Sequence, residues 1–155
     1  TPSMIQILFF YSVIFATVNL NNIVIGGIAF GINSGAYVAE IFRSGIMSVD
    51  KGQTEAGRSL GLNGWQTMRL IVLPQALKTA LPSLCNEFIV LIKETSVLAY
   101  IALTDLTKAA DYIRSRTFSP FTSYIVSALL YLVVISIFTK LVGKLERRLR
   151  RSDNR

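Results

Sequence analysis

The chain has 155 residues, of which 52% are hydrophobic and only 16% are charged, against about 25% charged residues in an ordinary soluble domain. Sixteen basic and nine acidic residues give a net charge of +7, and the sequence contains no histidine and a single cysteine. This composition excludes a disordered chain, an internal disulfide, a thiolate zinc cluster and histidine-based catalysis.

Long stretches without a charged residue predict helices that cross a membrane. The first charged residue is Glu40, and the stretch before it would measure about 58 Å as one helix, against about 30 Å for the hydrocarbon core of a bilayer. We therefore expect this stretch to fold back at the asparagine-rich segment 19–22. A second uncharged stretch, 117–139, is long enough for another crossing, whereas the helices of a soluble protein usually carry a charged face.

The predicted fold class is an all-α membrane protein, a polytopic bundle of about four transmembrane helices in a single domain over 1–155. The predicted spans are 2–18, 23–42, 80–104 and 117–139. Twelve Lys and Arg residues lie in the loop 43–78 and the tail 140–155, against three in the alternate loops. The positive-inside rule then places this loop and the C-terminal tail in the cytosol. Topology thus explains the basic charge, so we expect contact with membrane lipid and no nucleic-acid partner.

Small residues recur at every fourth position of the second predicted span. Gly27, Gly31, Gly35 and Ala39 form a groove along one helix face, which allows another helix to approach closely where lipid gives no hydrophobic drive. Helix packing is one interpretation of this groove. The other is a substrate path, because polar side chains lie beside it and need partners or a wet cavity at that depth. The polar residues of this candidate path are Asn33, Ser34 and Glu40.

The third predicted span is polar. Glu87 and Glu94 are seven residues apart and therefore fall on one helix face, with Lys93 beside them. Ionisable groups inside a membrane are costly, and they either pair with one another or mark a pathway. One hypothesis is a structural lock between Lys93 and the glutamates, which is favoured for Glu87. The other is a cavity in which Glu94 meets a charged solute.

The cytosolic loop 43–78 is longer than a helix connection needs, and it holds two predicted short helices. The first, 50–60, begins at Asp50 as its capping residue, and two glycines follow it. The second, 65–73, is expected to end at Pro74. Together they would form either a locally packed helical hairpin or a knob that docks on a soluble partner.

The same loop resembles the EAA loop of bacterial ABC importer permeases. The family pattern is Glu-Ala-Ala, three residues, Gly, nine residues, Ile, any residue and Leu-Pro, and the spacing matches throughout. The matching positions are Glu55, Ala56, Gly57, Gly61, Ile71, Leu73 and Pro74, with Gly57 in place of the third-position alanine. The flanking segments 33–43 and 86–96 resemble the polar-amino-acid branch of that family. The first helix of that branch has no counterpart here, and the chain opens on Thr1, so we expect an N-terminal portion to be missing.

The resemblance implies a permease subunit that moves a polar amino acid across the bacterial cytoplasmic membrane by alternating access, as a multi-pass protein with a cytosolic C-terminus. It implies a second permease, identical or similar, an extracytoplasmic solute-binding protein, and ATP-binding cassette subunits on which the motif residues dock. Those subunits would hold ATP and Mg. This chain lacks a glycine-rich phosphate loop, so we expect no cofactor, no metal site and no enzymatic activity in it. The substrate-pathway candidates are Asn33, Ser34, Glu40, Glu87, Lys93 and Glu94, with Ser34 and Glu94 first.

Two other functions stay open on the sequence. A passive channel or secondary transporter subunit would explain the charges in the third span but not the long two-helix loop. A non-transporting membrane scaffold for a soluble ATPase would explain the loop, and it would leave the polar residues with a bracing role only.

Overall fold

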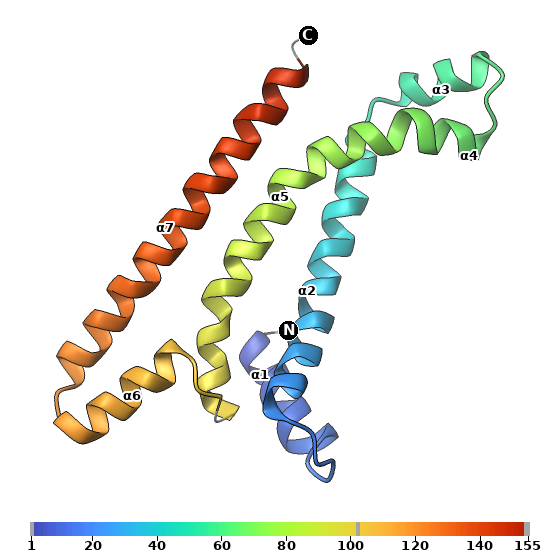
Figure 1. The fold of residues 1–155 in the computed structure, drawn as a ribbon. Helices are drawn as coiled ribbons and strands as arrows, with labels where there is room; N and C mark the ends of the chain where they lie inside the picture. The colour runs from blue at the N-terminus through green and yellow to red at the C-terminus, as the bar shows by residue number, and fades with distance from the viewer. Residues whose placement is uncertain (1, 102, 154–155) are drawn as a thin grey trace. The chain divides into compact units, whose positions relative to one another are not determined.

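The structure, a computed structural model, describes residues 2–101 and 103–153 and, within them, every side chain except those of Glu146 and 148–153. Outside the described residues lie Thr1, Ala102 and 154–155, which belong to the predicted N-terminal segment, third span and basic tail. The described residues form helices and no strand, which confirms the predicted all-α class (Figure 1). The elements are α1 (Ser3–Phe9), η1 (Phe10–Ile14), α2 (Asn22–Met47), α3 (Lys51–Ser59), α4 (Gly64–Thr67), η2 (Met68–Val72), α5 (Leu73–Glu94), η3 (Thr95–Ile101), α6 (Leu106–Thr117) and α7 (Pro120–Asp153).

Within the described residues, two helices are long and apolar enough to cross a membrane, α2 over its whole length and α7 over Pro120–Leu145. They correspond to the predicted span 23–42 and, from residue 120 onward, to the predicted span 117–139, whereas the helix of the third predicted span is not among them. The first predicted span is shorter in the structure, because its apolar helix runs only over Ser3–Ile14. That helix rises about 18 Å, which is less than the hydrocarbon core requires.

The contacts divide the chain into two compact units, to which α2, α5 and α7 each contribute. Unit 1 comprises residues 1–35 and 88–141, and unit 2 comprises residues 36–87 and 142–155. Unit 1 is built around a small buried cluster of Ile7, Ala29 and Ile101. The start of α2 is fixed to η3 in this unit, since the side-chain amide of Asn22 donates a 2.9 Å hydrogen bond to the carbonyl of Ile101.

Small residues bring helices together at positions other than the predicted groove. A Cβ added at Gly26 would lie 2.8 Å from a methyl of Leu98, so α2 contacts η3 closely there in unit 1. In unit 2, a Cβ added at Gly45 would lie 2.9 Å from the carbonyl oxygen of Ala76 and 3.2 Å from the Cβ of Ala80. The glycines of the predicted groove have no such neighbour within 4 Å, so no described helix of this chain fills it.

The prediction that Pro74 ends the second loop helix is wrong, because the helix continues through it. The segment 68–72 forms a wide π turn, in which the N–H of Leu73 bonds to the carbonyl of Met68 five residues earlier. Proline lacks an N–H, and its ring would clash with the carbonyl four residues back in a regular α-helix. A widened turn directly before the proline relieves this conflict. The helix that carries most of the third predicted span therefore begins at Leu73, and a 3₁₀ helix follows it after Glu94.

The charged segment 105–116, which connects the third and fourth predicted spans and was predicted to be a loop, forms the helix α6. Asp105 caps it, since its side chain accepts a 2.7 Å hydrogen bond from the N–H of Lys108. Phe118 ends it in the left-handed conformation with φ +52°, which turns the chain directly into α7. The Asp105 cap is the sequence signal that would have revealed this helix.

Two tyrosines in the first half of α7 form hydrogen bonds with residues of α6 and its cap. The phenol of Tyr124 donates a 2.8 Å hydrogen bond to Asp111, and the hydroxyl of Tyr131 lies 3.5 Å from Asp105. The bond from Tyr124 and the neighbouring guanidinium of Arg114 hold the pKa of Asp111 below its ordinary value. The two helices therefore pair in antiparallel fashion within unit 1.

Replacing Gly45 by alanine should destabilise the chain, because the new Cβ meets a backbone carbonyl of α5, which cannot move as a flexible side chain would. We expect a loss of about 1–3 kcal/mol, seen as a lower melting temperature of the chain in detergent. Gly35→Ala on the same helix is the matched control, since nothing lies within 4 Å of it. Equal melting temperatures for the two variants would contradict the packing described here.

Candidate functional site

The loop that the sequence predicts to be cytosolic folds as a helical hairpin, which we define as residues 50–72. Asp50 caps the first arm, α3, by accepting a 2.7 Å hydrogen bond from the N–H of Gly52. Asn63 begins the second arm with a capping box, in which its side chain accepts from the N–H of Gln66 and the Gln66 side chain accepts from the N–H of Asn63, both at 2.9 Å. The predicted cap at Asp50 is confirmed, and the second cap was not predicted.

Gly61 forms the tip of the hairpin. Its φ of +83° lies in the left-handed region that favours glycine. The N–H of Gly61 bonds to the carbonyl of Arg58 at 3.0 Å, and the N–H of Leu62 reaches the carbonyl of Gly57 at 3.2 Å. These bonds satisfy carbonyls at the end of α3 and fix the angle of the turn. The predicted interruption of the helix at Gly61 is confirmed.

Gly57 lies inside the hairpin. A Cβ at this position would lie 2.8 Å from the Cδ1 of Ile71 and 2.9 Å from the Cγ2 of Thr67. Thr67 is almost fully buried and donates a 3.0 Å hydrogen bond to the carbonyl of Asn63. The departure from the family pattern at Gly57 thus has a local cause, because these two side chains occupy the space that an alanine methyl would need. Two of the seven motif residues hold the arms of the hairpin together.

The outer surface of the hairpin carries other motif residues and large apolar ones. Glu55 and Ala56 are exposed on α3. Three large apolar side chains are also exposed, Leu60 at 80%, Trp65 at 72% and Leu70 at 62%. Because these apolar side chains are exposed, their burial does not stabilise the hairpin itself. Leu60 was not predicted as part of this surface, although its position directly before the turn glycine could have indicated it.

Polar groups of unit 1 meet where α1 passes α2. The amide of Asn33 donates a 2.8 Å hydrogen bond to the side-chain oxygen of Gln6, and the amide of Gln6 reaches the carbonyl of Ala29 at 3.4 Å. Ser34, next to Asn33, is buried. Gln6 was not predicted as a site residue, although its side chain is hydrogen-bonded to the predicted pathway residue Asn33.

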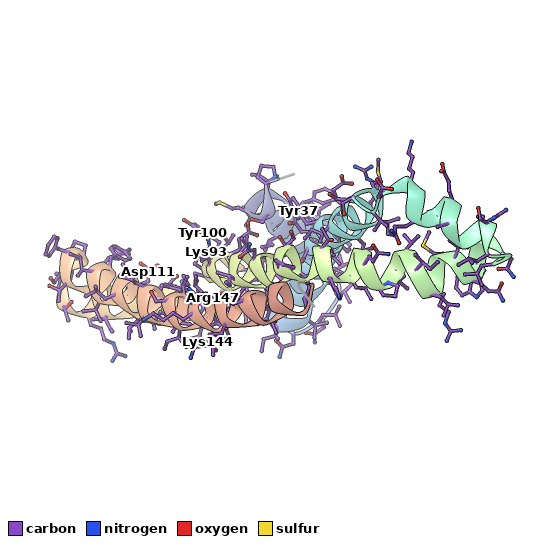
Figure 2. All side chains as sticks on the ribbon, turned by 90° about the horizontal axis from the view of Figure 1, so that it is seen from above. Tyr37, Lys93, Tyr100, Asp111, Lys144 and Arg147 are labelled. Atoms are coloured by element: carbon purple, nitrogen blue, oxygen red, sulfur yellow. The ribbon has the colours of Figure 1, made fainter. Side chains whose placement is uncertain are left out.

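Lys93 and Glu94 also belong to unit 1, at the end of α5. Glu94 is half-buried, and Lys93 is exposed. The side chain of Lys93 is labelled in Figure 2. Within the described part of the chain, the ammonium of Lys93 forms no ion pair with Glu87 or Glu94. The hypothesis of a lock through Lys93 therefore has no ion pair to support it here, and the pathway role of Glu94 stays a prediction.

The two remaining pathway candidates belong to unit 2. Glu40 is exposed and forms an ion pair with Arg43 on the next turn of α2. Glu87 is half-buried on α5. The six predicted pathway residues are thus divided between the two units.

The comparison with protein families gives a match over residues 1–151 to the binding-protein-dependent transport system inner membrane component. The chain is 48% identical over 121 residues to the probable amino-acid ABC transporter permease protein YckA of Bacillus subtilis, covering 78% of this chain and 54% of that protein. It is 35% identical over 153 residues to the glutamine transport system permease protein GlnP of Escherichia coli, covering 97% of this chain and 70% of that protein.

A solved structure is similar to this chain as well. The crystal structure of an amino acid ABC transporter with histidines matches with a TM-score of 0.90 and 45% identity, over 96% of this chain and 70% of the other. The resemblance to ABC importer permeases is therefore confirmed. This chain belongs to the family of binding-protein-dependent transport system inner membrane components.

Proposed function

We propose that this chain forms part of the membrane-spanning pathway of an ATP-driven importer for a polar amino acid. The observation that carries the proposal is a prefolded hairpin with the EAA spacing and exposed apolar side chains at its tip. A passive channel needs no such surface. The relatives named as amino-acid or glutamine permeases support the substrate class.

The hairpin is the docking element for an ATP-binding cassette subunit in this proposal. Leu60 and Trp65 flank the Gly61 turn and are largely exposed. Each would contribute about 1.5–3 kcal/mol if a groove on the partner removed it from water. The capped arms and the glycine turn hold these side chains in place before binding, so little conformational entropy is lost on docking. ATP and Mg would be bound by that partner.

A continuous helical segment connects the hairpin to a predicted pathway residue. The elements α4, η2 and α5 follow one another without a break from Gly64 to Glu94. A partner that moves the hairpin would therefore pull on the helix that carries Glu94. A population change of about 10⁴-fold between inward- and outward-facing states requires about 5.5 kcal/mol of differential binding, which docking on an ATP-driven partner would supply.

The polar groups of unit 1 suit a zwitterionic solute. An amino acid brings an ammonium and a carboxylate, both of which need partners in a low dielectric. Gln6, Asn33 and Ser34 offer amide and hydroxyl groups, and the half-buried carboxylate of Glu94 suits a cationic group. A second permease and an extracytoplasmic solute-binding protein complete the importer in this proposal, and the basic tail holds the C-terminus in the cytosol.

Leu60→Asp and Trp65→Ala should weaken association with the ATP-binding subunit, because both remove exposed apolar area from the tip of the hairpin. Loss of a binding hot spot of about 2 kcal/mol corresponds to about 30-fold weaker binding. The measurement is co-purification of the ATP-binding subunit with tagged permease from solubilised membranes. Gln53→Ala is the matched control on the same hairpin, where only an exposed 3.3 Å hydrogen bond with Gln75 is lost. Unchanged recovery of the partner with both tip variants would contradict docking through the tip.

Glu94→Gln should change which amino acids are transported, because it removes the carboxylate proposed to pair with a cationic group. We expect uptake of cationic amino acids to fall about tenfold relative to neutral ones, as for the loss of about 1.4 kcal/mol. The measurement is competition for labelled amino-acid uptake by the complete transporter in proteoliposomes. Recovery of the ATP-binding subunit and its ATPase rate serve as controls for assembly. An unchanged selectivity profile would remove Glu94 from the pathway and favour a scaffold.

A further inference from the structure

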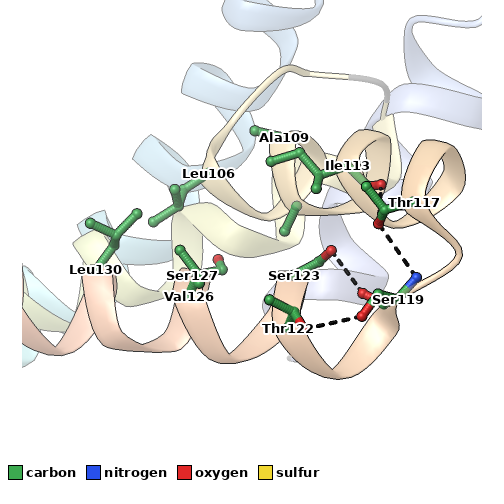
Figure 3. Close-up of a pocket in the computed structure, with 11 residues that line it drawn as sticks. Leu106, Ala109, Ile113, Thr117, Ser119, Thr122, Ser123, Val126, Ser127 and Leu130 are labelled. Atoms are coloured by element: carbon green, nitrogen blue, oxygen red, sulfur yellow. Dashed lines mark hydrogen bonds between the residues drawn. The ribbon is translucent and has the colours of Figure 1, made fainter.

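An apolar cleft of about 260 Å³ lies between α6 and the first half of α7, in unit 1 (Figure 3). Its lining is Leu106, Ala109, Ala110, Ile113, Thr117, Ser119, Thr122, Ser123, Val126, Ser127 and Leu130. No charged side chain contributes to this lining. None of the hairpin residues and none of the predicted pathway residues lines this cleft, so neither part of the proposed function accounts for it.

The cleft is apolar at one end and hydroxyl-rich at the other. Leu106 and Leu130 lie at one end, and Thr117, Ser119 and Thr122 lie at the other, at the joint between the helices (Figure 3). The hydroxyl of Ser119 bonds to that of Thr122 at 3.0 Å. A ligand with an apolar tail and a polar end would therefore match both ends of the cleft.

Basic side chains flank the hydroxyl-rich end. Arg114 and Arg116 lie in the last turn of α6, next to the joint. Arg114 pairs with Asp111 through its Nε at 3.1 Å, which leaves the terminal nitrogens of its guanidinium outside that bond. Asp105, the other acidic residue of 105–130, caps the opposite end of α6. The last turn of α6 therefore has two basic side chains against one acidic neighbour, Asp111.

The depth of the cleft corresponds to one leaflet of a bilayer. Between Pro120 and Leu130, α7 rises about 15 Å, which is half of the hydrocarbon thickness of about 30 Å. Phe118 and Phe121 at the joint are 88% and 76% exposed, and exposed aromatic rings are typical of the level of the lipid headgroups. The joint therefore lies at one membrane surface, and the apolar end lies near the middle of the bilayer.

We propose that this cleft binds one acyl chain of an anionic phospholipid, whose phosphate is held by Arg114 and Arg116. The tail lies against Ile113, Val126 and Leu130, and the glycerol ester region meets the hydroxyls of Ser119 and Thr122. A bound lipid then brings the joint between α6 and α7 into contact with the negative membrane surface. The guanidinium groups select phosphate oxygens through charge-assisted hydrogen bonds.

The test uses the complete transporter, stripped of lipid in detergent and titrated with dioleoyl-phosphatidylglycerol or dioleoyl-phosphatidylcholine. Retained lipids are counted by native mass spectrometry, and the apparent affinity is taken from the rise in melting temperature. The double variant R114Q/R116Q should bind phosphatidylglycerol about 30-fold more weakly, as expected for removal of two basic groups near a lipid surface. Its affinity for phosphatidylcholine should change less. These arginines are exposed, so we expect their replacement to cost the fold only the exposed ion pair of Arg114 with Asp111.

Two further variants separate this site from general attraction to lipid. K140Q/K144Q removes the same charge near the other end of α7 and should leave the affinity within about twofold. Val126→Trp fills the cleft from an exposed position and should abolish retention of the lipid. Equal losses in the two charge variants, retention of lipid by Val126→Trp, or a protein segment or second copy cross-linked into the cleft would each overturn the proposal.

Discussion

The hairpin depends on the close approach of Gly57 to Thr67 and Ile71. Because position 57 has no side chain, the two arms pack against each other through a buried threonine and a branched apolar side chain. This contact places Thr67 and Ile71 of the second arm against Gly57, while Leu60, directly before the turn at Gly61, stays largely exposed. A loop without such packing would present the same residues on a mobile segment, and binding would then have to order it.

The motif residues divide into two groups by their position in the hairpin. Gly57 and Ile71 face the interior, and Gly61 sets the turn, whereas Glu55 and Ala56 remain on the surface. The spacing of the motif therefore specifies the fold of the hairpin as well as its contact surface. The docking energy in our proposal comes largely from exposed apolar side chains beside the motif, which the spacing does not define.

Much of this architecture could be predicted from the sequence, because charge distribution and capping residues act locally. The long apolar helices, the cap at Asp50 and the break at Gly61 all follow from such local signals. The continuation through Pro74 could not be predicted, since it depends on a π turn that widens the preceding backbone. The helix at 106–117 was not predicted, because its charged residues suggested a loop although Asp105 is a clear capping residue.

The site itself was only partly predictable. The pairing of Gln6 with Asn33 joins residues far apart in the chain, and no local pattern announces such a contact. For the groove of Gly27, Gly31 and Gly35 the sequence pattern is clear, but no helix of the described chain packs against it. Small-residue spacing predicts that a helix is able to approach closely, but it does not identify which helix does so.

The central claim is that the hairpin stands in the cytosol with Leu60 at its surface. In a chain whose Cys85 is replaced by serine, Leu60→Cys would be exposed to a membrane-impermeant maleimide in sealed vesicles of both orientations. The account predicts labelling in inside-out vesicles alone, and the opposite pattern for a cysteine at Phe118, which is also largely exposed and follows a loop predicted on the other side of the membrane. Labelling of position 60 in right-side-out vesicles, or in neither orientation, would contradict the account.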